Sequence, residues 1–377
     1  MALWYTLTVV SRAGRRLHSL IYICWSLPRR PTLDVIFPLM KIQENVSLAP
    51  FTTFRIGGAA RFFVHASSVA DVEEALAFAE EKNLSIFILG GGSNILISDA
   101  GFDGLVIKNE IRGITEELQG DSTRIIAGAG ESWDDLVKFA VEKKGLYGLE
   151  NLSFIPGTVG AAPVQNIGAY GSEVKDTIEW VEVYNSKTKK IEKISNIECH
   201  FAYRDSVFKH EKKHNVILRV AFLLQKNSKL SIDYKDVKKY FEDRKSQPSL
   251  CGVRDAIVEI RKNKLPDTSK IGTAGSFFKN VTIPKNNYED LLKKYPLMPA
   301  FTQDQMVKVP TAWILDNVCG FKGVRRGEVG VYQNQALVLV NFGKGTAQEI
   351  KNLSNEMIAS VKEKTGIVIS PEVEFIG

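Results

Sequence analysis

The feature that most limits how this chain can fold is an uncharged stretch at residues 155–171, IPGTVGAAPVQNIGAYG. It combines four glycines and two prolines with other small residues and with the carboxamides of Gln165 and Asn166. Surface loops are usually charged or serine-rich, and long loops without regular structure are often functional. We therefore interpret the stretch as an ordered loop whose backbone lies against a flat ring and a diphosphate, with a packed internal loop as the alternative. It lacks the GK[ST] sequence of a P-loop, which argues against a nucleoside-triphosphatase.

A second glycine-rich turn, GGGSN, lies at residues 90–94 between two apolar segments that predict strands. It differs from the Rossmann fingerprint, because Ile95 stands where the third glycine is required and a strand pattern follows in place of a helix. A strand–glycine turn–strand can still bind phosphate, since consecutive backbone N–H groups form a concave anion site. A tight hairpin is the alternative, and this motif alone does not decide between the two.

Composition and charge narrow the class of protein. The 377 residues suffice for two or three domains, and 44% hydrophobic with 24% charged residues is typical of globular proteins. The four cysteines form no CxxC pair, which argues against a zinc or other metal site and against a disulfide framework, and fits the cytoplasm. The net charge is +6, but residues 1–39 contain five arginines and one acidic residue and so supply +4 of it. We therefore expect no nucleic-acid partner.

Residues 1–39 are expected to be an N-terminal extension that is not part of the fold. Their first apolar run, MALWYTLTVV, precedes any basic residue, which reverses the order of a secretory signal. The second run, LIYICWSL, is too short to span a bilayer, so we expect no membrane partner. The basic, acid-poor composition would also suit an organelle transit peptide. We favour translation from Met40, because MKIQENVSLAP reads as a natural start and the preceding segment has no periodic pattern.

Alternating and helical patterns predict α+β regions on both sides of a boundary near residue 226. Ser68 and Asp71 predict a capping box for the first helix, and Ser132 predicts the start of a second helix that ends at Gly145. Strands are predicted at 61–66, 85–89, 95–98, 104–109, 123–130, 216–224, 335–341 and 371–377, with a hairpin at 180–195. Further helices are predicted at 234–247, 253–264, 287–295, 311–318 and 346–364.

Five motifs then follow one another along the chain: ILGGGSN, IPGTVGAAPVQNIGAYG, YRDSVFK, GTAGSFFKN and PEVEF. In this order and spacing they resemble the UDP-N-acetylenolpyruvoylglucosamine reductase family, flavoenzymes that complete UDP-N-acetylmuramic acid for bacterial peptidoglycan. The resemblance covers residues 45–377. It implies a vanillyl-alcohol-oxidase-like (PCMH-type) FAD-binding fold of two α+β subdomains and a C-terminal α+β substrate domain. We place the two subdomains at 40–110 and 111–226 and the substrate domain at 227–377.

The resemblance also implies a reaction. NADPH reduces noncovalently bound FAD and leaves, and the enolpyruvyl ether of UDP-N-acetylglucosamine then enters. Hydride from the flavin reaches the vinyl carbon, so a carbanion or enol forms beside the substrate carboxylate. Such an intermediate needs cationic and hydrogen-bonding stabilisation, and a proton on one face.

Three residues match the catalytic positions of the family. Ser276 matches the proton donor, a role that a weak acid can fill because a carbanion is a stronger base than an alkoxide; a turn serine is the alternative. Arg204 matches the arginine near the substrate carboxylate, to which a planar guanidinium is suited. Glu372, after the proline of PEVEF, matches its acidic partner and would need a raised pKa, whereas Glu374 shares the strand face but does not follow the proline. For Arg204 and Glu372, sequence alone favours an ordinary ion pair.

Other family positions match residues of the two glycine loops and of the C-terminal half. The FAD contacts that this implies are Gly90, Gly91, Gly92, Ser93, Asn94, Gly157, Thr158, Gly160, Ala161, Ala162, Gln165, Asn166, Gly168 and Ala169. The implied substrate contacts are Tyr170, Tyr234, Lys264 and Asn280, with Tyr234 on a loop that closes over the substrate. Ala161 and Ala162 stand where relatives often carry hydroxyls, so phosphate contacts there are expected from the backbone only. Val281 stands where relatives often have proline, which leaves the path of that loop open.

Two other functions fit parts of the pattern. Another FAD-dependent oxidoreductase of the same fold, such as a carbohydrate oxidase, usually tethers its flavin through histidine, and neither glycine loop contains one. A catalytically silent nucleotide-binding module would not need Ser276, Arg204 and Glu372 together. We expect a monomer that binds the UDP-sugar substrate and both cofactors, FAD and NADPH.

Overall fold

The computed structural model of the protein describes residues 41–377. The prediction made for residues 1–39 lies outside the described residues. The described part combines helices and strands in an α+β arrangement. None of its helices has both the length and the apolar composition that crossing a bilayer requires.

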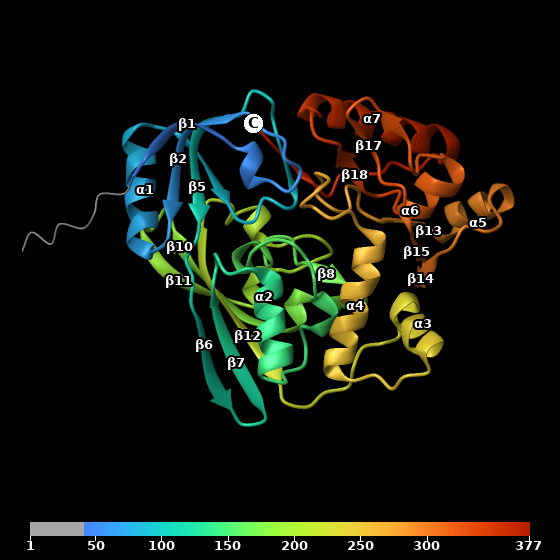
Figure 1. Ribbon diagram of the computed structural model, residues 1–377, viewed down its shortest axis with the longest axis horizontal. Coiled ribbons are helices and arrows are strands. Elements are labelled where there is room, and N and C mark those ends of the chain that lie inside the picture. The colour runs from blue at the N-terminus through green and yellow to red at the C-terminus, as the bar shows by residue number, and fades with distance from the viewer. Residues whose placement is uncertain (1–40) are drawn as a thin grey trace, which may run out of the picture. The chain divides into compact units, whose positions relative to one another are not determined.

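The first part of the described chain forms a four-stranded sheet with the order β1-β2-β5-β3 (Figure 1). The helix α1 begins after Ser68, whose hydroxyl accepts the N–H of Asp71 while the Asp71 carboxylate accepts the N–H of Ser68, so the predicted capping box is confirmed. Val72 and Leu76 of α1 pack against one face of the sheet, and Phe63 is buried on the other. The elements are β1 Gln43–Ser47, η1 Ala49–Phe51, β2 Ala59–Ala66, α1 Val69–Glu81, β3 Ser85–Leu89 and β5 Phe102–Asn109.

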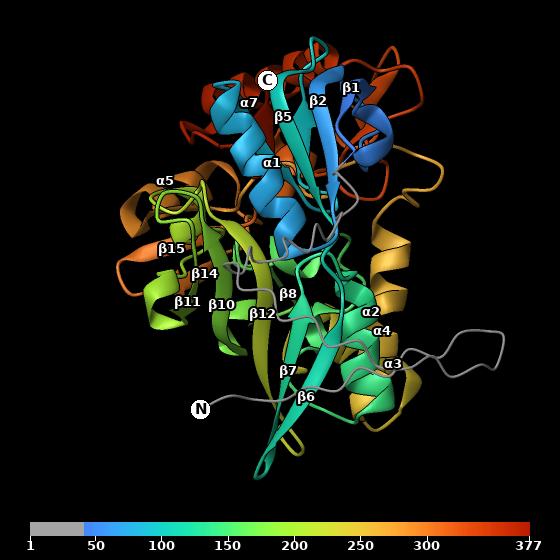
Figure 2. The same cartoon turned by 90° about the vertical axis from the view of Figure 1, so that its left-hand side faces the viewer.

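The next part of the chain forms a five-stranded sheet with the order β11-β10-β12-β7-β6, in which all neighbours are antiparallel (Figure 2). The predicted hairpin is confirmed, with Asn185 opposite Lys190 at its turn. The predicted second helix starts at its N-cap Ser132 and buries Trp133 against Phe222. The main elements are β6 Ile114–Gln119, β7 Ser122–Gly128, α2 Trp133–Lys138, η2 Phe139–Lys143, β10 Ile178–Asn185, β11 Lys190–Ser195 and β12 Val216–Gln225.

The long glycine loop and the turns near it contain only short elements. They are η3 Glu150–Leu152, η4 Val159–Ala161, β8 Gly168–Ala169, β9 Ser172–Glu173, η5 Val174–Asp176, η6 Ile197–Cys199 and η7 Val207–Lys209. η3 lies between β8 and the helices, since it packs against β8 on one hand and against α2 and α4 on the other.

The C-terminal half contains the predicted helices and two small sheets, with the strand orders β13-β15-β14 and β16-β17-β18. The strand predicted at 335–341 is shorter than expected, because only Leu339–Asn341 forms β18. The residues before it turn, with the Phe277 N–H donating to Leu337 O at 2.7 Å, so they cross the GTAGSFFKN segment. The elements are α3 Lys235–Arg244, α4 Leu250–Lys264, β13 Val281–Pro284, α5 Lys285–Lys294, β14 Phe301–Gln303, β15 Met306–Val309, α6 Thr311–Trp313, η8 Ile314–Val318, β16 Arg325–Arg326, β17 Val329–Val331, β18 Leu339–Asn341 and α7 Ala347–Thr365.

The last strand returns to the first part of the chain. β19 (Glu374–Ile376) pairs in parallel with β4 (Ile95–Ile97), the strand that follows GGGSN. β3, the strand before GGGSN, pairs instead with β5. The GGGSN turn therefore joins strands of two different sheets, and the hairpin alternative is wrong. The pairing also brings the PEVEF motif beside the first glycine loop.

Candidate active site

The two glycine loops lie directly against each other. The Ser93 hydroxyl donates to Pro156 O at 2.9 Å. A Cβ on Gly91 would lie 2.6 Å from the Gly157 Cα, and a Cβ on Gly92, where φ is +61°, would lie 2.0 Å from Phe51 O. No side chain fits at such distances. Gly91 is therefore required for the contact between the two loops, and Gly92 for the contact with the backbone at Phe51.

The same loops offer unpaired donors. Within residues 41–377, no backbone oxygen accepts a hydrogen bond from the N–H groups of Gly91, Gly92, Ser93, Gly157 or Thr158. Consecutive free N–H groups on two touching loops form a concave site suited to a diphosphate. The residues present therefore fit the diphosphate of a dinucleotide such as FAD.

Other residues of the second loop are occupied within the protein. The N–H groups of Gly160, Ala161 and Ala162 donate to Ala129 O, Thr158 O and Val159 O, so the expected backbone contacts of Ala161 and Ala162 to phosphate have no free donor. The buried Asn166 carboxamide donates to Glu173 Oε2 at 2.9 Å and to Ala202 O at 3.0 Å. Gln165 Oε1 accepts from Asn94 Nδ2 at 2.6 Å and so links the loops. Gly168 and Ala169 form β8, and Lys108 Nζ donates to Gly90 O at 2.7 Å.

Arg204 and Glu372 meet in a buried ion pair. Arg204 Nε lies 2.8 Å from Glu372 Oε1, and the two side chains are 19% and 10% exposed. Arg204 Nη2 also donates to Gly168 O at 2.8 Å, and a Cβ on Gly168 would lie 3.0 Å from Arg204 Nη1. Burial raises the pKa of Glu372 above its ordinary value, although the charges of Arg204, Lys209 and Lys279 oppose the rise. Glu374, by contrast, is exposed.

The segment that contains Ser276 pairs with the segment that contains Glu372. Phe277, next to Ser276, accepts the N–H of Glu372 through its carbonyl at 2.7 Å, and the Glu372 carbonyl accepts from Asn94 Nδ2 at 3.1 Å. Ser276 itself is exposed, while Phe277 and Phe278, which follow it, are fully buried. The five motifs are thus joined through direct contacts around the Arg204–Glu372 pair, and Ser276 is exposed next to a residue that contacts Glu372.

Three lysines that sequence reasoning did not single out surround the pair. Lys209 Nζ donates to Arg204 O at 3.0 Å, and burial together with the Lys279 charge lowers the pKa of Lys209. Lys308 Nζ lies 4.1 Å from the ring centroid of Tyr203, and burial and the Arg204 charge lower its pKa. Lys209 and Lys279 belong to recognised motifs, but Lys308 lies in a strand without any sequence signal. Lys209 and Lys279 thus add positive charge near Glu372, and Lys308 adds it near Arg204, while Glu173 and Glu374 supply negative charge in the same region.

The expected substrate contacts lie in two groups. Tyr170 and Tyr234 are in edge contact, with ring centroids 5.2 Å apart, and burial raises the pKa of Tyr170 to about 12. Near them, Lys264 forms an ion pair with Asp236. Asn280 lies apart from these three, where its N–H contacts the Tyr203 hydroxyl at 3.4 Å and its side chain accepts the N–H of Thr311.

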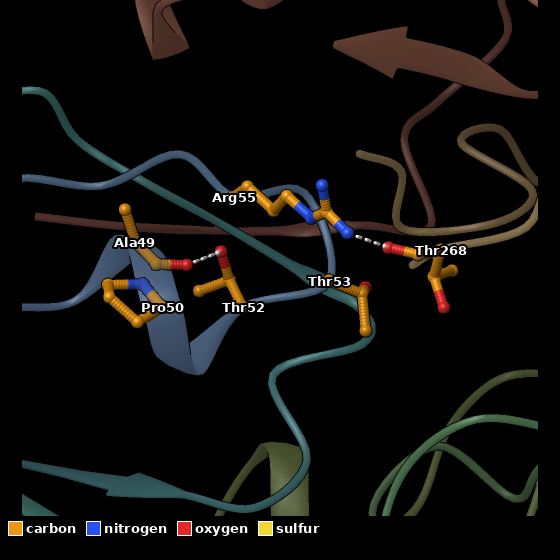
Figure 3. A pocket seen from close by; sticks show the side chains of 6 residues that line it. All are labelled: Ala49, Pro50, Thr52, Thr53, Arg55 and Thr268. Atoms are coloured by element: carbon orange, nitrogen blue, oxygen red, sulfur yellow. Dashed lines mark hydrogen bonds between the residues drawn. The ribbon is translucent and has the colours of Figure 1, made fainter. Parts of the chain in front are cut away.

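A pocket of about 460 Å³ is formed by the segment from Ala49 to Arg55 together with Thr268 (Figure 3). Arg55 closes one side, since its Nη2 donates to Thr268 O at 2.6 Å. Thr53 connects the pocket to the first glycine loop, with its N–H donating to Gly92 O at 3.0 Å. The residues lining it are Ala49, Pro50, Thr52, Thr53, Arg55 and Thr268, none of which was predicted as a site residue.

Comparison with known proteins agrees with this geometry. A reductase of this kind from Flavobacterium johnsoniae, named UDP-N-acetylenolpyruvoylglucosamine reductase, is 42% identical over 89% of this chain and 100% of its own length. The chain belongs to the UDP-N-acetylenolpyruvoylglucosamine reductase family. A relative of the same name from Pseudomonas aeruginosa is 40% identical over 88% of this chain and 98% of its own. The crystal structure of such a reductase from Thermus caldophilus has the same fold, with a TM-score of 0.63 at 23% identity over 90% of this chain and 100% of that one.

Two domain models of known families divide the site between them. The FAD binding domain model matches residues 60–194, which include both glycine loops. The UDP-N-acetylenolpyruvoylglucosamine reductase C-terminal domain model matches residues 266–376, which include Ser276 and Glu372. Arg204 lies outside both matches. It is the ion pair with Glu372 that joins it to the C-terminal domain.

Proposed function

We propose that the site around Ser276, Arg204 and Glu372 carries out the reaction of the reductase family. The protein is an FAD-dependent oxidoreductase of peptidoglycan precursor synthesis, and its reaction is the NADPH-dependent reduction of UDP-N-acetylglucosamine enolpyruvate to UDP-N-acetylmuramate. The observation that supports the assignment best is the convergence of five separate motifs on one buried ion pair. Another FAD-dependent oxidoreductase function is not favoured.

The FAD site is proposed to lie along the two glycine loops, with residues 40–110 and 111–226 as its two subdomains. The free N–H groups of residues 91–93 and of Gly157 and Thr158 would hold the diphosphate. The remaining predicted FAD contacts would shape the loops, since several are already bonded within the protein. When bound, FAD supplies the hydride that adds to the vinyl carbon of the substrate.

Arg204 and Glu372 are proposed to receive the substrate carboxylate. Negative charge grows on that carboxylate as its neighbouring carbon gains electron density, and a guanidinium fixed by Gly168 and Glu372 needs no rearrangement to stabilise it. Because burial raises the pKa of Glu372, its carboxyl group can hold a proton and share it with the carboxylate. The charges of Lys209, Lys279 and Lys308 add to the positive field.

Ser276 is proposed to supply the proton. Its hydroxyl donates to the carbon that carries the carboxylate, so the double bond gains one hydride and one proton in total. The resulting alkoxide regains a proton from water, which the exposed position of Ser276 permits. A neutral donor also adds no charge near the path of the hydride.

The remaining assignments concern the substrate and the cell. Tyr170, Tyr234, Lys264 and Asn280 are proposed to contact the UDP diphosphate. Residues 227–377 are proposed to form the substrate domain, whose last strand β19 pairs with β4 in a sheet separate from the four-stranded one. Lys264 would exchange Asp236 for the diphosphate. We propose a monomeric cytoplasmic enzyme without a nucleic-acid or membrane partner.

The function is tested by the absorbance spectrum of the purified protein. It should show bound oxidised flavin, lose the flavin band on addition of NADPH without oxygen, and recover it on addition of UDP-N-acetylglucosamine enolpyruvate. Protein that takes up no FAD, or reduced flavin that the enolpyruvyl substrate does not reoxidise, would refute the assignment.

A further inference from the structure

Phe154, which directly precedes the long glycine loop, has an unusual backbone conformation. Its φ is +59°, in the left-handed region that bulky residues rarely adopt. Its side chain does not account for this, because the residue is 38% exposed. Such a conformation persists only where surrounding contacts impose it, and it is often found at functional sites.

The contacts that impose it come from two helices. The Phe154 N–H donates to Asp134 Oδ1 of α2 at 2.5 Å. The Phe154 carbonyl accepts from Arg261 Nε of α4 at 2.9 Å. The two peptide groups that flank the Phe154 Cα are thus each held by a charged side chain, one from α2 and one from α4.

Arg254 fixes the carboxylate that holds Phe154. It is 5% exposed, and its Nη1 and Nη2 donate to the two oxygens of Asp134 at 2.7 and 3.1 Å. Its Nε donates to Glu142 Oε1 at 2.9 Å, so all three guanidinium nitrogens donate to carboxylates and link α4 to α2 and η2. Burial alone would raise the pKa of Asp134, but the hydrogen bonds from Arg254 and Phe154 outweigh it and the pKa is lowered.

Phe154 lies three positions before Gly157, the first residue of the long glycine loop whose unpaired N–H group is proposed to hold the diphosphate. After Phe154 come Pro156, whose carbonyl accepts from Ser93, and then Gly157 and Thr158 with unpaired N–H groups. We propose that Arg254 is a positioning residue for FAD, because through Asp134 it holds Phe154 in the left-handed turn that directs these N–H groups to the diphosphate. The inference rests on the proposed FAD site.

The expected effect follows from the fraction of molecules with a competent loop. Without Arg254, Asp134 loses its bidentate partner and Phe154 can relax to an ordinary conformation. The apparent dissociation constant then rises as the inverse of the competent fraction, so a loop that is competent about one tenth of the time binds FAD about tenfold more weakly. Because the loop also relaxes while FAD is bound and its N–H groups then leave the diphosphate, we expect this loss of affinity in the release rate, where most differences between variants of one site lie.

The test measures how fast FAD leaves the holoenzyme, followed by the rise of free-flavin fluorescence after dilution, together with the Tm. Arg254→Met should release FAD about tenfold faster. Arg254→Lys should lie between Met and the parent, because one ammonium cannot replace a fork that bonds two carboxylates. Arg244→Met is the matched control: it breaks an exposed pair with Glu259 that also involves α4, and it should release FAD at the parent rate.

A second pair of variants tests the backbone directly. Asn adopts the left-handed conformation far more readily than a β-branched residue, so Phe154→Val should release FAD about tenfold faster than Phe154→Asn. These variants also keep the test decisive if Arg254→Met does not fold. A lower Tm with an unchanged release rate in Arg254→Met, or equal rates for Val and Asn at position 154, would overturn the inference while leaving the FAD site intact. A parent protein without FAD would refute the proposed function and the inference together.

Discussion

Arg204→Met isolates the electrostatics of the candidate site. Both members of the ion pair with Glu372 are largely buried, at 19% and 10% side-chain exposure. Removing one partner of a buried pair typically costs about 3–5 kcal/mol, because an uncompensated charge remains. Lys209 and Lys279 also stabilise the Glu372 carboxylate and would remain in the variant. We therefore expect the loss in unfolding free energy to lie near the lower end of this range, about 3 kcal/mol at neutral pH.

The loss should depend on pH in a defined direction. Glu372 already has a raised pKa in the folded protein, and loss of Arg204 raises it further. A raised carboxyl pKa means that the folded state is favoured while the group is protonated and loses stability as pH rises through the folded pKa. The gap between parent and variant should therefore be small near pH 4.5, the ordinary Glu value, and grow toward pH 8. About 1 kcal/mol should persist at all pH values, because the hydrogen bond from Arg204 to Gly168 is lost as well.

Urea unfolding at several pH values measures the gap. The double variant Arg204→Met/Glu372→Gln, in which no buried carboxylate remains, should recover most of the loss at neutral pH. Arg326→Met breaks an exposed pair with Glu356 and should change stability by less than about 1 kcal/mol. A pH-independent gap, or no recovery with Glu372→Gln, would show that the pair is not desolvated and would refute this reasoning.

Three further predictions concern the cofactor and the fold. Acid precipitation should leave the flavin in the supernatant, because neither glycine loop contains a histidine to tether it; flavin in the pellet would indicate a covalent link. A chain that begins at Met40 should keep its flavin and activity, because every residue of the candidate site lies in the later part; failure of that chain to fold would contradict this. Gly91→Ala should destabilise the fold by about 1–3 kcal/mol and lower the flavin content, since its Cβ would lie 2.6 Å from the Gly157 backbone; an unchanged Tm would show that the loops can separate freely.

Local features of this fold were predictable from the sequence. The capping box at Ser68 and the hairpin turning after Asn185 depend on residues within a few positions of each other, so their patterns are complete in the sequence. The order of the five motifs also indicated that Ser276, Arg204 and Glu372 belong to one site, and Arg204 does contact Glu372. The strand predicted at 335–341 was too long, because the peptide groups of Leu337 and Val338 pair with the distant GTAGSFFKN segment and the chain bends there.

Long-range contacts were not predictable in this way. GGGSN reads equally as a hairpin, and only the pairing of β4 with β19 excludes it. Lys308 lies close enough to Arg204 for the two charges to interact, but no motif in the sequence marks it. Arg254 is only 5% exposed, yet in the sequence it is one of many charged residues on a helix. In each case the partners are separated by many residues, and charge patterns on a helix do not show which positions become buried.

The central claim is that Ser276 donates the proton in the second half of the reaction, and stopped-flow flavin absorbance of Ser276→Ala tests it most directly. Reduction of the flavin by NADPH should proceed near the parent rate, because that step takes no proton from Ser276. Reoxidation by UDP-N-acetylglucosamine enolpyruvate should slow by about 10²–10⁴-fold, the scale expected for loss of a positioned acid, and Ser276→Cys should recover part of the rate. Equal reoxidation rates in parent and Ser276→Ala would contradict the claim and leave Ser276 as a turn residue.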